Sequence, residues 1–324
     1  MGTKYIKKTI QIGDKKTDCA NAWNIAFGVD NNYLPFACVT MLSIVKNNQN
    51  RRIFFHVFCD FVNEDDVLKL QRIKEENNLI EITCYLVDES LLQDFPQGHG
   101  WNLSIYYRAI APIVLCGEVN KLLYLDADIV CLGDATHLFS IDVDGVVAAV
   151  VKDGTGTNTI DKRLDLLGIS KDINSSYFNS GVMLINVRAY NKEKILSKFV
   201  QVIDTKREVL FFFDQDAFNI VLSRQVKYID NKYNYQNLDK PVDNPCFVHF
   251  AGVRKPWFKN FDYYFFDEWR KVYHDSEWRN IPLKYKDNVK PSEYRYQAQY
   301  HFCKGSYFSA VTDYCRYLFR KIKG

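Results

Sequence analysis

Two aspartates spaced two residues apart are the strongest chemical signal in this sequence. Asp126 and Asp128 follow an apolar run at residues 122–125, which is typical of a buried strand, and their spacing places both carboxylates on one side of an extended chain. Two carboxylates at the end of a strand suit Mg²⁺ or Mn²⁺ carrying a diphosphate. A solvated turn is the alternative, because Asp is common in turns. The position after an apolar strand of an α/β pattern favours the metal site.

His249 and Lys255 are the next candidates for such a site. His249 ends the apolar run 246–248, and Gly252 and Lys255 follow it. The glycine lets the backbone come close to a ligand, and the ammonium group could meet a phosphate as a point charge. A lone His after a strand is more often a hydrogen-bonded structural residue. Here the neighbouring Gly and Lys favour a metal and phosphate site.

Two polar clusters lie beside predicted secondary structure. Asn179 and Ser180 precede a predicted strand at 181–187, where an amide and a hydroxyl could bind sugar hydroxyls, although a strand-entry turn explains them equally well. The Asp-Gln-Asp sequence at 214–216 follows three aromatic residues at a predicted helix start, where Asp214 could simply be the N-cap. Neither cluster assigns a function by itself.

The elements that must position these residues alternate between strands and helices. This alternation predicts an α/β fold, with a mostly parallel, Rossmann-like sheet covered by helices on both faces and ligands at the carboxyl ends of the strands. We divide the 324 residues into an N-terminal arm (1–23), a core domain (24–257) and a basic, aromatic, helical C-terminal segment (258–324). The predicted strands are 23–29, 53–59, 80–87, 121–125, 146–151 and 181–187, and the predicted helices are 33–46, 64–78, 106–116, 192–205 and 215–222.

Composition excludes several classes of protein. Hydrophobic residues make up 47% and charged residues 25%, as in ordinary globular proteins. Nine cysteines form no C-x-x-C pair, and the start of the chain lacks the apolar region of a secretory signal, which together favour reduced thiols and a cytoplasmic protein. The sequence contains none of the G-x-G-x-x-G, P-loop or G-x-S-x-G motifs. Dinucleotide oxidoreductases, P-loop NTPases and α/β-hydrolases therefore lose their main support.

The C-terminal segment differs from the body in charge. Residues 284–324 hold nine Lys and Arg against three Asp and Glu, a local charge of +6, which leaves −3 for the rest of a chain with net charge +3. The body therefore has no nucleic-acid-binding signature. A basic helix with one apolar face can lie on an anionic membrane surface, and a helix packed on the core is the alternative. The apolar face comprises Tyr307, Val311, Tyr314, Leu318 and Ile322, flanked by Arg316, Arg320, Lys321 and Lys323.

Taken in chain order, these motifs resemble glycosyltransferase family 8, the retaining GT-A enzymes, and within it the bacterial lipopolysaccharide core glucosyl- and galactosyltransferases. The likeness runs from about residue 24 to 257. In that family an acidic loop holds uracil and ribose, and the arginine of a Tyr-x-Arg helix start contacts the donor. The residues implied to bind the donor are Gly28, Asp30, Asn32, Tyr33, Arg108, Asp126, Ala127, Asp128, Asn179, Gly181, Asp214, Gln215, His249, Gly252 and Lys255.

The resemblance implies a retaining hexosyltransferase that uses Mn²⁺ or Mg²⁺. Glucose or galactose would move from UDP-glucose or UDP-galactose to a sugar of the lipopolysaccharide core, at the inner face of the bacterial inner membrane. The metal ligands would be Asp126, Asp128 and His249. Gln215, Asp214 and Asp153 would be catalytic, with Gln215 stabilising charge, because Gln is a poor nucleophile.

Two other functions compete with this hypothesis. A sugar-nucleotide binding module without turnover could lose Asp128 or Lys255 freely, and both are present. A sugar nucleotidyltransferase would need a Gly- and Lys/Arg-rich loop after the first strand to hold a triphosphate, and residues 27–36 offer none. Both alternatives are therefore disfavoured.

Overall fold

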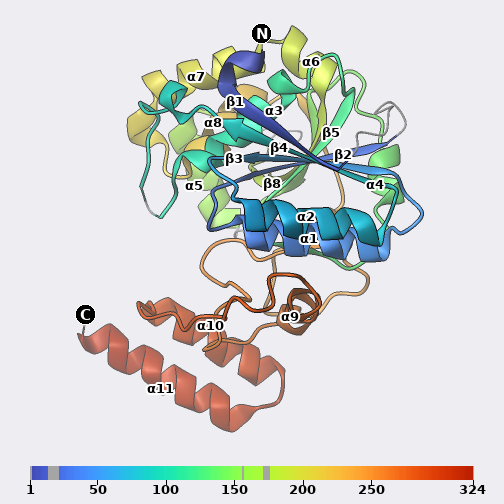
Figure 1. Ribbon diagram of the computed structural model, residues 1–324. Coiled ribbons are helices and arrows are strands. Elements are labelled where there is room, and N and C mark those ends of the chain that lie inside the picture. The colour runs from blue at the N-terminus through green and yellow to red at the C-terminus, as the bar shows by residue number, and fades with distance from the viewer. Residues whose placement is uncertain (1, 14–21, 99, 155–156, 171–175, 324) are drawn as a thin grey trace.

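An eight-stranded sheet forms the centre of the computed structural model, which describes residues 2–13, 22–98, 100–154, 157–170 and 176–323. The strand order is β1-β4-β3-β2-β5-β8-β7-β9, and a separate two-stranded ladder joins β6 to β10. Figure 1 shows the central sheet with β1 to β5 and β8 labelled. The strands are β1 (Ile6–Ile12), β2 (Trp23–Val29), β3 (Ile53–Cys59), β4 (Ile80–Val87), β5 (Lys121–Leu125), β6 (Ile129–Cys131), β7 (Ala148–Lys152), β8 (Phe178–Asn186), β9 (Val226–Tyr228) and β10 (Phe247–His249).

The parallel part of the sheet follows from its buried apolar runs. Strands β4, β3, β2 and β5 pair in parallel, and β3 is buried along its whole length. A parallel strand is covered on both faces, so its sequence is almost continuously hydrophobic. Strand β8 runs antiparallel to both β5 and β7, and β7 pairs in parallel with β9. The prediction of a mostly parallel sheet is confirmed.

The N-terminal arm contains a strand that the sequence analysis missed. Strand β1 pairs antiparallel with β4 at the edge of the sheet, and only Ile12 is buried on it. An edge strand has a single neighbour and is often polar, so it carries no apolar run.

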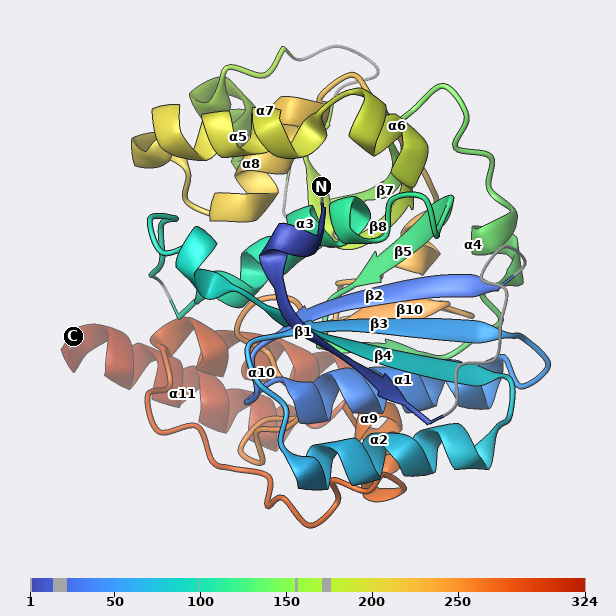
Figure 2. The same cartoon turned by 45° about the horizontal axis from the view of Figure 1, so that its top comes forward.

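Helices cover both faces of the sheet (Figure 2), and each face has its own hydrophobic core. The helix predicted at 192–205 is confirmed from Ile195 onward, and the sequence analysis missed a separate short helix that ends at Lys192. Lys194, between the two helices, has a left-handed backbone with φ of 53°. On one face lie α1 (Leu34–Asn47) and α2 (Glu64–Glu76); on the other lie α3 (Tyr107–Val114), α5 (Thr157–Leu167), α6 (Val187–Lys192), α7 (Ile195–Thr205) and α8 (Phe213–Leu222).

The chain beyond residue 257 is anchored on α1 by aromatic rings. Trp257 stacks on Phe36 with ring centroids 3.9 Å apart, and Trp269 packs beside it. Helix α9 (Phe266–His274) contributes Trp269, and α10 (Pro291–Cys303) and α11 (Tyr307–Lys323) lie side by side beyond it (Figure 1). The predicted helical C-terminal segment is confirmed.

The apolar face of helix α11 is largely exposed. The side of α11 that faces α10 carries Ala310 and Asp313, both buried, and Asp313 pairs with His301 of α10 at 3.0 Å. Helix α11 therefore packs on α10 through its other side. Every residue of the predicted face is at least 42% exposed: Tyr307, Val311, Tyr314, Leu318 and Ile322.

The cysteines that the structure describes are all free thiols. The sequence predicted no disulfide framework, in agreement with this finding. Among the described residues, none of the helices combines the length and the apolar content that a membrane span requires.

Candidate active site

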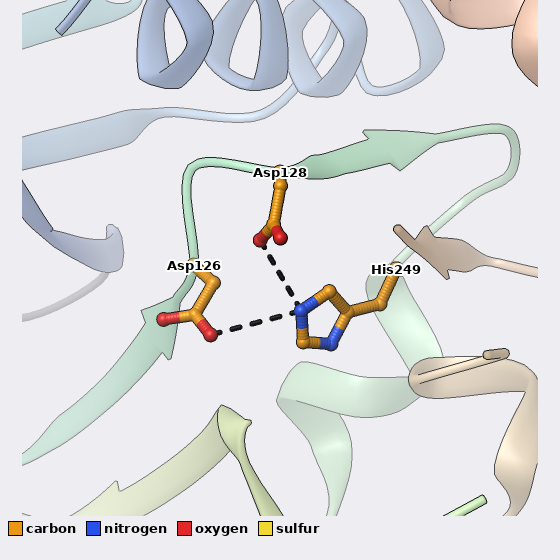
Figure 3. A group of neighbouring side chains, drawn as sticks. All are labelled: Asp126, Asp128 and His249. Carbon is orange, nitrogen blue, oxygen red and sulfur yellow. Dashed lines mark ion pairs between the residues drawn. The ribbon is translucent and has the colours of Figure 1, made fainter. Parts of the chain in front are cut away.

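Asp126, Asp128 and His249 meet where the sheet adjoins the small ladder (Figure 3). Asp126 follows β5, Asp128 precedes β6, and His249 ends β10, which pairs with β6. The Nε2 atom of His249 lies 3.2 Å from Oδ1 of Asp128 and 3.7 Å from Oδ2 of Asp126. One ligand atom from each residue lies within 4.8 Å of the other two. Two carboxylates and an imidazole that converge in this way fit a divalent metal ion.

The backbone of the Asp-Ala-Asp turn is held from several sides. The hydroxyl of Thr40 on α1 lies 3.0 Å from the carbonyl oxygen of Ala127 and 2.7 Å from that of Ile129. The amide of Asp126 donates to the carbonyl of Gly181 on β8 at 2.8 Å. The backbone that carries the two carboxylates is therefore held in place.

Gly181 is required by close packing against these ligands. A Cβ atom at this position would lie 2.4 Å from Cε1 of His249 and 2.6 Å from Oδ2 of Asp126. No other residue type fits there without moving a ligand.

Arg108 is a buried cation shared by two carboxylates. It donates from Nη2 to Oδ1 of Asp126 at 2.8 Å and from Nη1 to the hydroxyl of Ser180 at 2.8 Å, and its Nε lies 3.1 Å from Oδ2 of Asp214. Burial alone would lower the pKa of Arg108, but the charges of Asp126 and Asp214 more than offset this and raise it. Burial also raises the pKa of Asp214 to about 6, although Arg108 opposes the shift.

Lys255 contacts the second carboxylate of the turn. Its ammonium group pairs with Oδ2 of Asp128 and donates to the carbonyl of Phe250 at 2.8 Å. Burial would raise the pKa of Asp128, but Lys255 and His249 lower it below its usual value. Gly252 has φ of 75°, a left-handed conformation that favours glycine in the turn between His249 and Lys255.

The side-chain amide of Gln215 has all its hydrogen-bonding positions occupied. Its Oε1 accepts from Nδ2 of Asn179 at 3.0 Å and from the backbone amide of Ser180 at 3.1 Å. Its Nε2 donates to the hydroxyl of Tyr177 at 3.2 Å and to Oδ2 of Asp153 at 3.3 Å. Two acceptor and two donor positions are the full capacity of a primary amide. The amide plane is therefore fixed.

A buried ion pair lies behind Gln215. The hydroxyl of Tyr177 donates to Oδ1 of Asp216 at 2.6 Å, and Arg163 donates from Nε to the same oxygen at 2.8 Å. Asp216 is fully buried and also accepts from the amide of Phe212 at 2.7 Å. Asp216 therefore stabilises the start of α8 and the position of Tyr177 together.

The predicted nucleotide-binding loop follows β2. Asp30 accepts from the amide of Tyr33 at 2.8 Å and from Nδ2 of Asn102 at 2.6 Å. Tyr33 and Asn32 are exposed, and the ring of Tyr33 meets Trp257 edge-on with centroids 5.8 Å apart. Close packing explains the glycine at position 28, because a Cβ there would lie 2.9 Å from the Cβ of Tyr107.

The structure corrects two local predictions. Asn179 and Ser180 lie within β8, not in a turn before it. Asp214 is not an N-cap: α8 begins at Phe213 after Phe212, and no side chain caps it. The glutamine and both aspartates of this motif therefore belong to the first turn of the helix.

Sequence reasoning missed three residues next to the site. Asn234 contacts His249, and Tyr177 and Arg163 form the network behind Gln215. No local motif marks Asn234, because its position depends on the pairing of Tyr235 with Val248 of β10, a contact that residue spacing does not encode. Tyr177 and Arg163 have no local signal either.

Asp126, Asp128 and His249, with Lys255 beside them, lie at the carboxyl end of a sheet strand, which is where ligands bind in open α/β sheets. A mostly parallel sheet with this Asp-x-Asp turn at its strand ends defines the class of GT-A glycosyltransferases. The chain belongs to glycosyl transferase family 8, whose model matches residues 24–261. The C-terminal model of the same family matches residues 266–321. The protein is therefore a glycosyltransferase.

Curated relatives match over nearly the whole chain. A lipopolysaccharide 1,2-glucosyltransferase of Escherichia coli is 29% identical, with 96% of this chain and 93% of that protein covered. A lipopolysaccharide 1,3-galactosyltransferase of Salmonella typhimurium is also 29% identical, with 99% of each covered. A solved structure of the galactosyltransferase LgtC, in complex with donor and acceptor sugar analogs, has a TM-score of 0.69. That structure is 19% identical and covers 78% of this chain and 96% of its own, which shows the shared fold.

Proposed function

We propose that this glycosyltransferase is a retaining hexosyltransferase that moves glucose or galactose from UDP-glucose or UDP-galactose to a sugar hydroxyl of the lipopolysaccharide core. The observation that carries the proposal is the convergence of Asp126, Asp128 and His249 beside Lys255. The similarity to lipopolysaccharide glucosyl- and galactosyltransferases supports the choice of donor and acceptor.

The acidic turn would hold a divalent ion. Carboxylate oxygens suit Mg²⁺ and Mn²⁺, whereas imidazole is a common ligand of transition metals, so the mixed set favours Mn²⁺. The bound ion would supply Lewis-acid stabilisation of the charge that develops on the departing diphosphate. Lys255 would add a second positive charge after it leaves Asp128 for the phosphate.

Gln215 would act as a fixed dipole rather than as a nucleophile. Its Oε1 already accepts two hydrogen bonds, so neither lone pair is free to form a bond to the sugar. The acceptor hydroxyl would attack the anomeric carbon on the face from which the diphosphate leaves. The bond from carbon to the diphosphate oxygen breaks with its electron pair, and the hydroxyl proton passes to the leaving diphosphate. Asp214 and Asp153 would position the sugar hydroxyls.

The parts of the chain with different functions would have the boundaries given in the sequence analysis. Residues 24–257 would form the catalytic domain, with Asp30, Asn32 and Tyr33 around the uridine of the donor. The exposed ring of Tyr33 is held edge-on by Trp257 and can offer its face to a base. Residues 1–23 would complete the edge of the sheet through β1.

Residues 258–324 would dock the enzyme on the anionic inner face of the bacterial inner membrane, in the cytoplasm. The exposed apolar face of α11 supports this role, together with a largely apolar groove of about 430 Å³ between α10 and α11. The flanking Arg316, Arg320 and Lys321 would meet lipid headgroups. A docked enzyme would meet a lipid-anchored acceptor at a high local concentration.

A donor screen tests the proposed function. The purified protein is incubated with UDP-glucose or UDP-galactose, Mn²⁺ and truncated lipopolysaccharide. We expect metal-dependent release of UDP and transfer of labelled hexose with retained configuration. Pyrophosphate-dependent turnover would identify a nucleotidyltransferase instead, and donor binding without release of UDP would identify a binding module.

A further inference from the structure

Two buried asparagines connect the candidate metal ligand His249 to Gln215 by hydrogen bonds. Nδ1 of His249 lies 2.9 Å from Oδ1 of Asn234, and Nδ2 of Asn234 lies 2.9 Å from Oδ1 of Asn179. Nδ2 of Asn179 then lies 3.0 Å from Oε1 of Gln215. Asn234 is 2% exposed and Asn179 is 8% exposed, so water competes little for these bonds.

Two backbone amides fix the direction of every bond in this chain. Gly181 donates its N–H to Oδ1 of Asn179 at 3.0 Å, and Ser180 donates its N–H to Oε1 of Gln215 at 3.1 Å. A backbone N–H can only donate, so both of these side-chain atoms must be oxygens. Asn179 therefore presents its NH₂ group to Gln215. Asn234 must present its own NH₂ group to the oxygen of Asn179.

The same logic assigns the proton on His249. With its NH₂ group committed to Asn179, Asn234 presents an oxygen to Nδ1 of His249. That oxygen accepts, so Nδ1 carries the proton, and Nε2 of the neutral ring keeps its lone pair. Nε2 is the nitrogen that faces Asp126 and Asp128. A metal ligand needs this tautomer.

We infer that Asn234 is a positioning residue with two effects. It selects the tautomer of His249 that can bind a metal ion, and through Asn179 it helps to hold the amide of Gln215. The inference rests on the proposed function only for the roles of His249 and Gln215. Pairing with β10 holds Asn234 in place, because Tyr235 donates to Phe247 at 2.9 Å and His249 donates to Tyr235 at 2.8 Å through their backbones.

The tautomer can be observed directly in the metal-free protein. Long-range ¹H–¹⁵N spectra of ¹⁵N-histidine-labelled protein are recorded over a range of pH, and the tautomer is determined from the spectra that show His249 as a neutral ring. The signal of His249 is assigned with a His249→Gln variant. We expect the proton on Nδ1 in the wild type and a mixture of both tautomers in Asn234→Ala. A wild-type His249 with its proton on Nε2 would overturn the inference.

Metal affinity and turnover separate the two effects of Asn234. Binding of Mn²⁺ is followed by the electron paramagnetic resonance of the free ion. Asn234→Ala should bind Mn²⁺ about ten- to a hundredfold more weakly, the usual loss when the partner of a metal-binding His is removed. Asn234→Asp keeps an oxygen towards His249 but loses the donor to Asn179. Its Mn²⁺ affinity should stay within about threefold of wild type, while kcat at saturating Mn²⁺ falls about tenfold and the KM for the donor changes little.

Asn48 provides a matched control. It is also a buried asparagine, but its side chain bonds to the backbone of Ile44 and Ala135 at the end of α1. Asn48→Ala should lower stability without changing Mn²⁺ affinity or the tautomer of His249. Should Asn234→Ala fail to fold, Asn234→Asp is tested in its place. A kcat of Asn234→Asp equal to that of the wild type would overturn the link to Gln215. A wild type that binds Mn²⁺ but transfers no hexose would contradict the proposed function. The observed tautomer of His249 would then still confirm or refute the role of Asn234.

Discussion

Arg108 donates to one oxygen of Asp126 and leaves the other oxygen facing the candidate metal site. The Nη2 atom of Arg108 lies 2.8 Å from Oδ1 of Asp126, and Oδ2 of Asp126 lies 3.7 Å from Nε2 of His249. The guanidinium is buried and is held by Ser180 as well, so it fixes the rotation of this carboxylate. The ligand geometry is therefore set by the protein itself, which reduces the cost of ordering the site when an ion binds.

Replacing either carboxylate of the acidic turn should abolish metal binding and transfer. Asp126→Asn and Asp128→Asn keep the shape of the side chain but remove the charge that a hard cation needs. We expect hexose transfer to fall at least about a hundredfold, with an unchanged circular dichroism spectrum. Asp142→Asn, at an exposed carboxylate before β7, is the control and should transfer normally. Near-normal turnover in a variant that lacks both carboxylates would refute the metal assignment.

Removing the amide of Gln215 should affect the rate of the reaction more than donor binding. We expect Gln215→Ala to lower kcat by roughly ten- to a thousandfold with a donor KM close to wild type, as for the loss of one preorganised polar group. Gln225→Ala serves as the control, because the side chain of Gln225 donates to the backbone carbonyl of Val221, away from the site. A glycosyl adduct on Gln215, detected by mass spectrometry, would show that the residue is a nucleophile.

Because the pKa of Asp214 is raised, replacing Asp214 by a neutral residue should stabilise the folded protein by an amount that depends on pH. Its pKa is about 6 in the folded protein and about 3.9 in an unfolded chain, so ionised Asp214 destabilises the fold above pH 6 and has almost no effect below pH 4. Asp214→Asn should therefore raise the free energy of unfolding by about 2–3 kcal/mol at pH 8. The gain should shrink steadily towards pH 4.

Urea unfolding of wild type and Asp214→Asn at pH 8 and pH 5 measures this difference. Each comparison is made at one pH, so that other titrating groups affect both proteins alike. A variant that is less stable than wild type at pH 8 would contradict the prediction.

A methyl group at position 181 should disturb metal binding without a change of charge. The Cβ of Gly181→Ala would lie 2.4 Å from Cε1 of His249 and 2.6 Å from Oδ2 of Asp126, so at least one ligand must move. We expect Mn²⁺ affinity to fall about tenfold or more. The control is Gly133→Ala, whose Cβ would meet its nearest atoms at 3.7 Å, an ordinary contact. Equal Mn²⁺ affinity in both variants would mean that His249 or Asp126 is not a ligand.

The exposed face of α11 should be needed for attachment to anionic vesicles. We expect the wild type to float with such vesicles at low salt and to detach at high salt, because each basic residue near the surface contributes about 1 kcal/mol. A triple variant of this face, Val311→Ser, Leu318→Ser and Ile322→Ser, should float much less.

The control for the vesicle experiment replaces exposed apolar residues elsewhere. Leu68 on α2 and Leu166 on α5 are 59% and 56% exposed, similar to the positions on α11. Leu68→Ser with Leu166→Ser should float like the wild type. Equal flotation of the α11 variant and this control would show that α11 does not dock on the membrane.

The sequence alone determined those parts of the fold and site whose signals are local. Strands β3, β4 and β5 were predicted with the bounds that the structure has, because short runs rich in apolar, β-branched and aromatic residues between loops are typical of strands. Asp126 and Asp128 were recognised because they follow such a run directly. The local charge of +6 and the apolar face of α11 were also readable from residue spacing.

Only the tertiary structure decided features that depend on distant partners. The edge strand β1 exists through its pairing with β4, some seventy residues away, and its polar sequence gives no sign of this. The sequence of the apolar face of α11 is compatible with burial and with exposure. Only the position of α10 shows which side of α11 is buried. Asn234 meets His249 and Asn179 across 15 and 55 residues of chain. A hydrogen bond between side chains requires its partners within about 3 Å. Only the packing of β8 and β10 against the Asn234 segment brings them that close, and no local spacing encodes it.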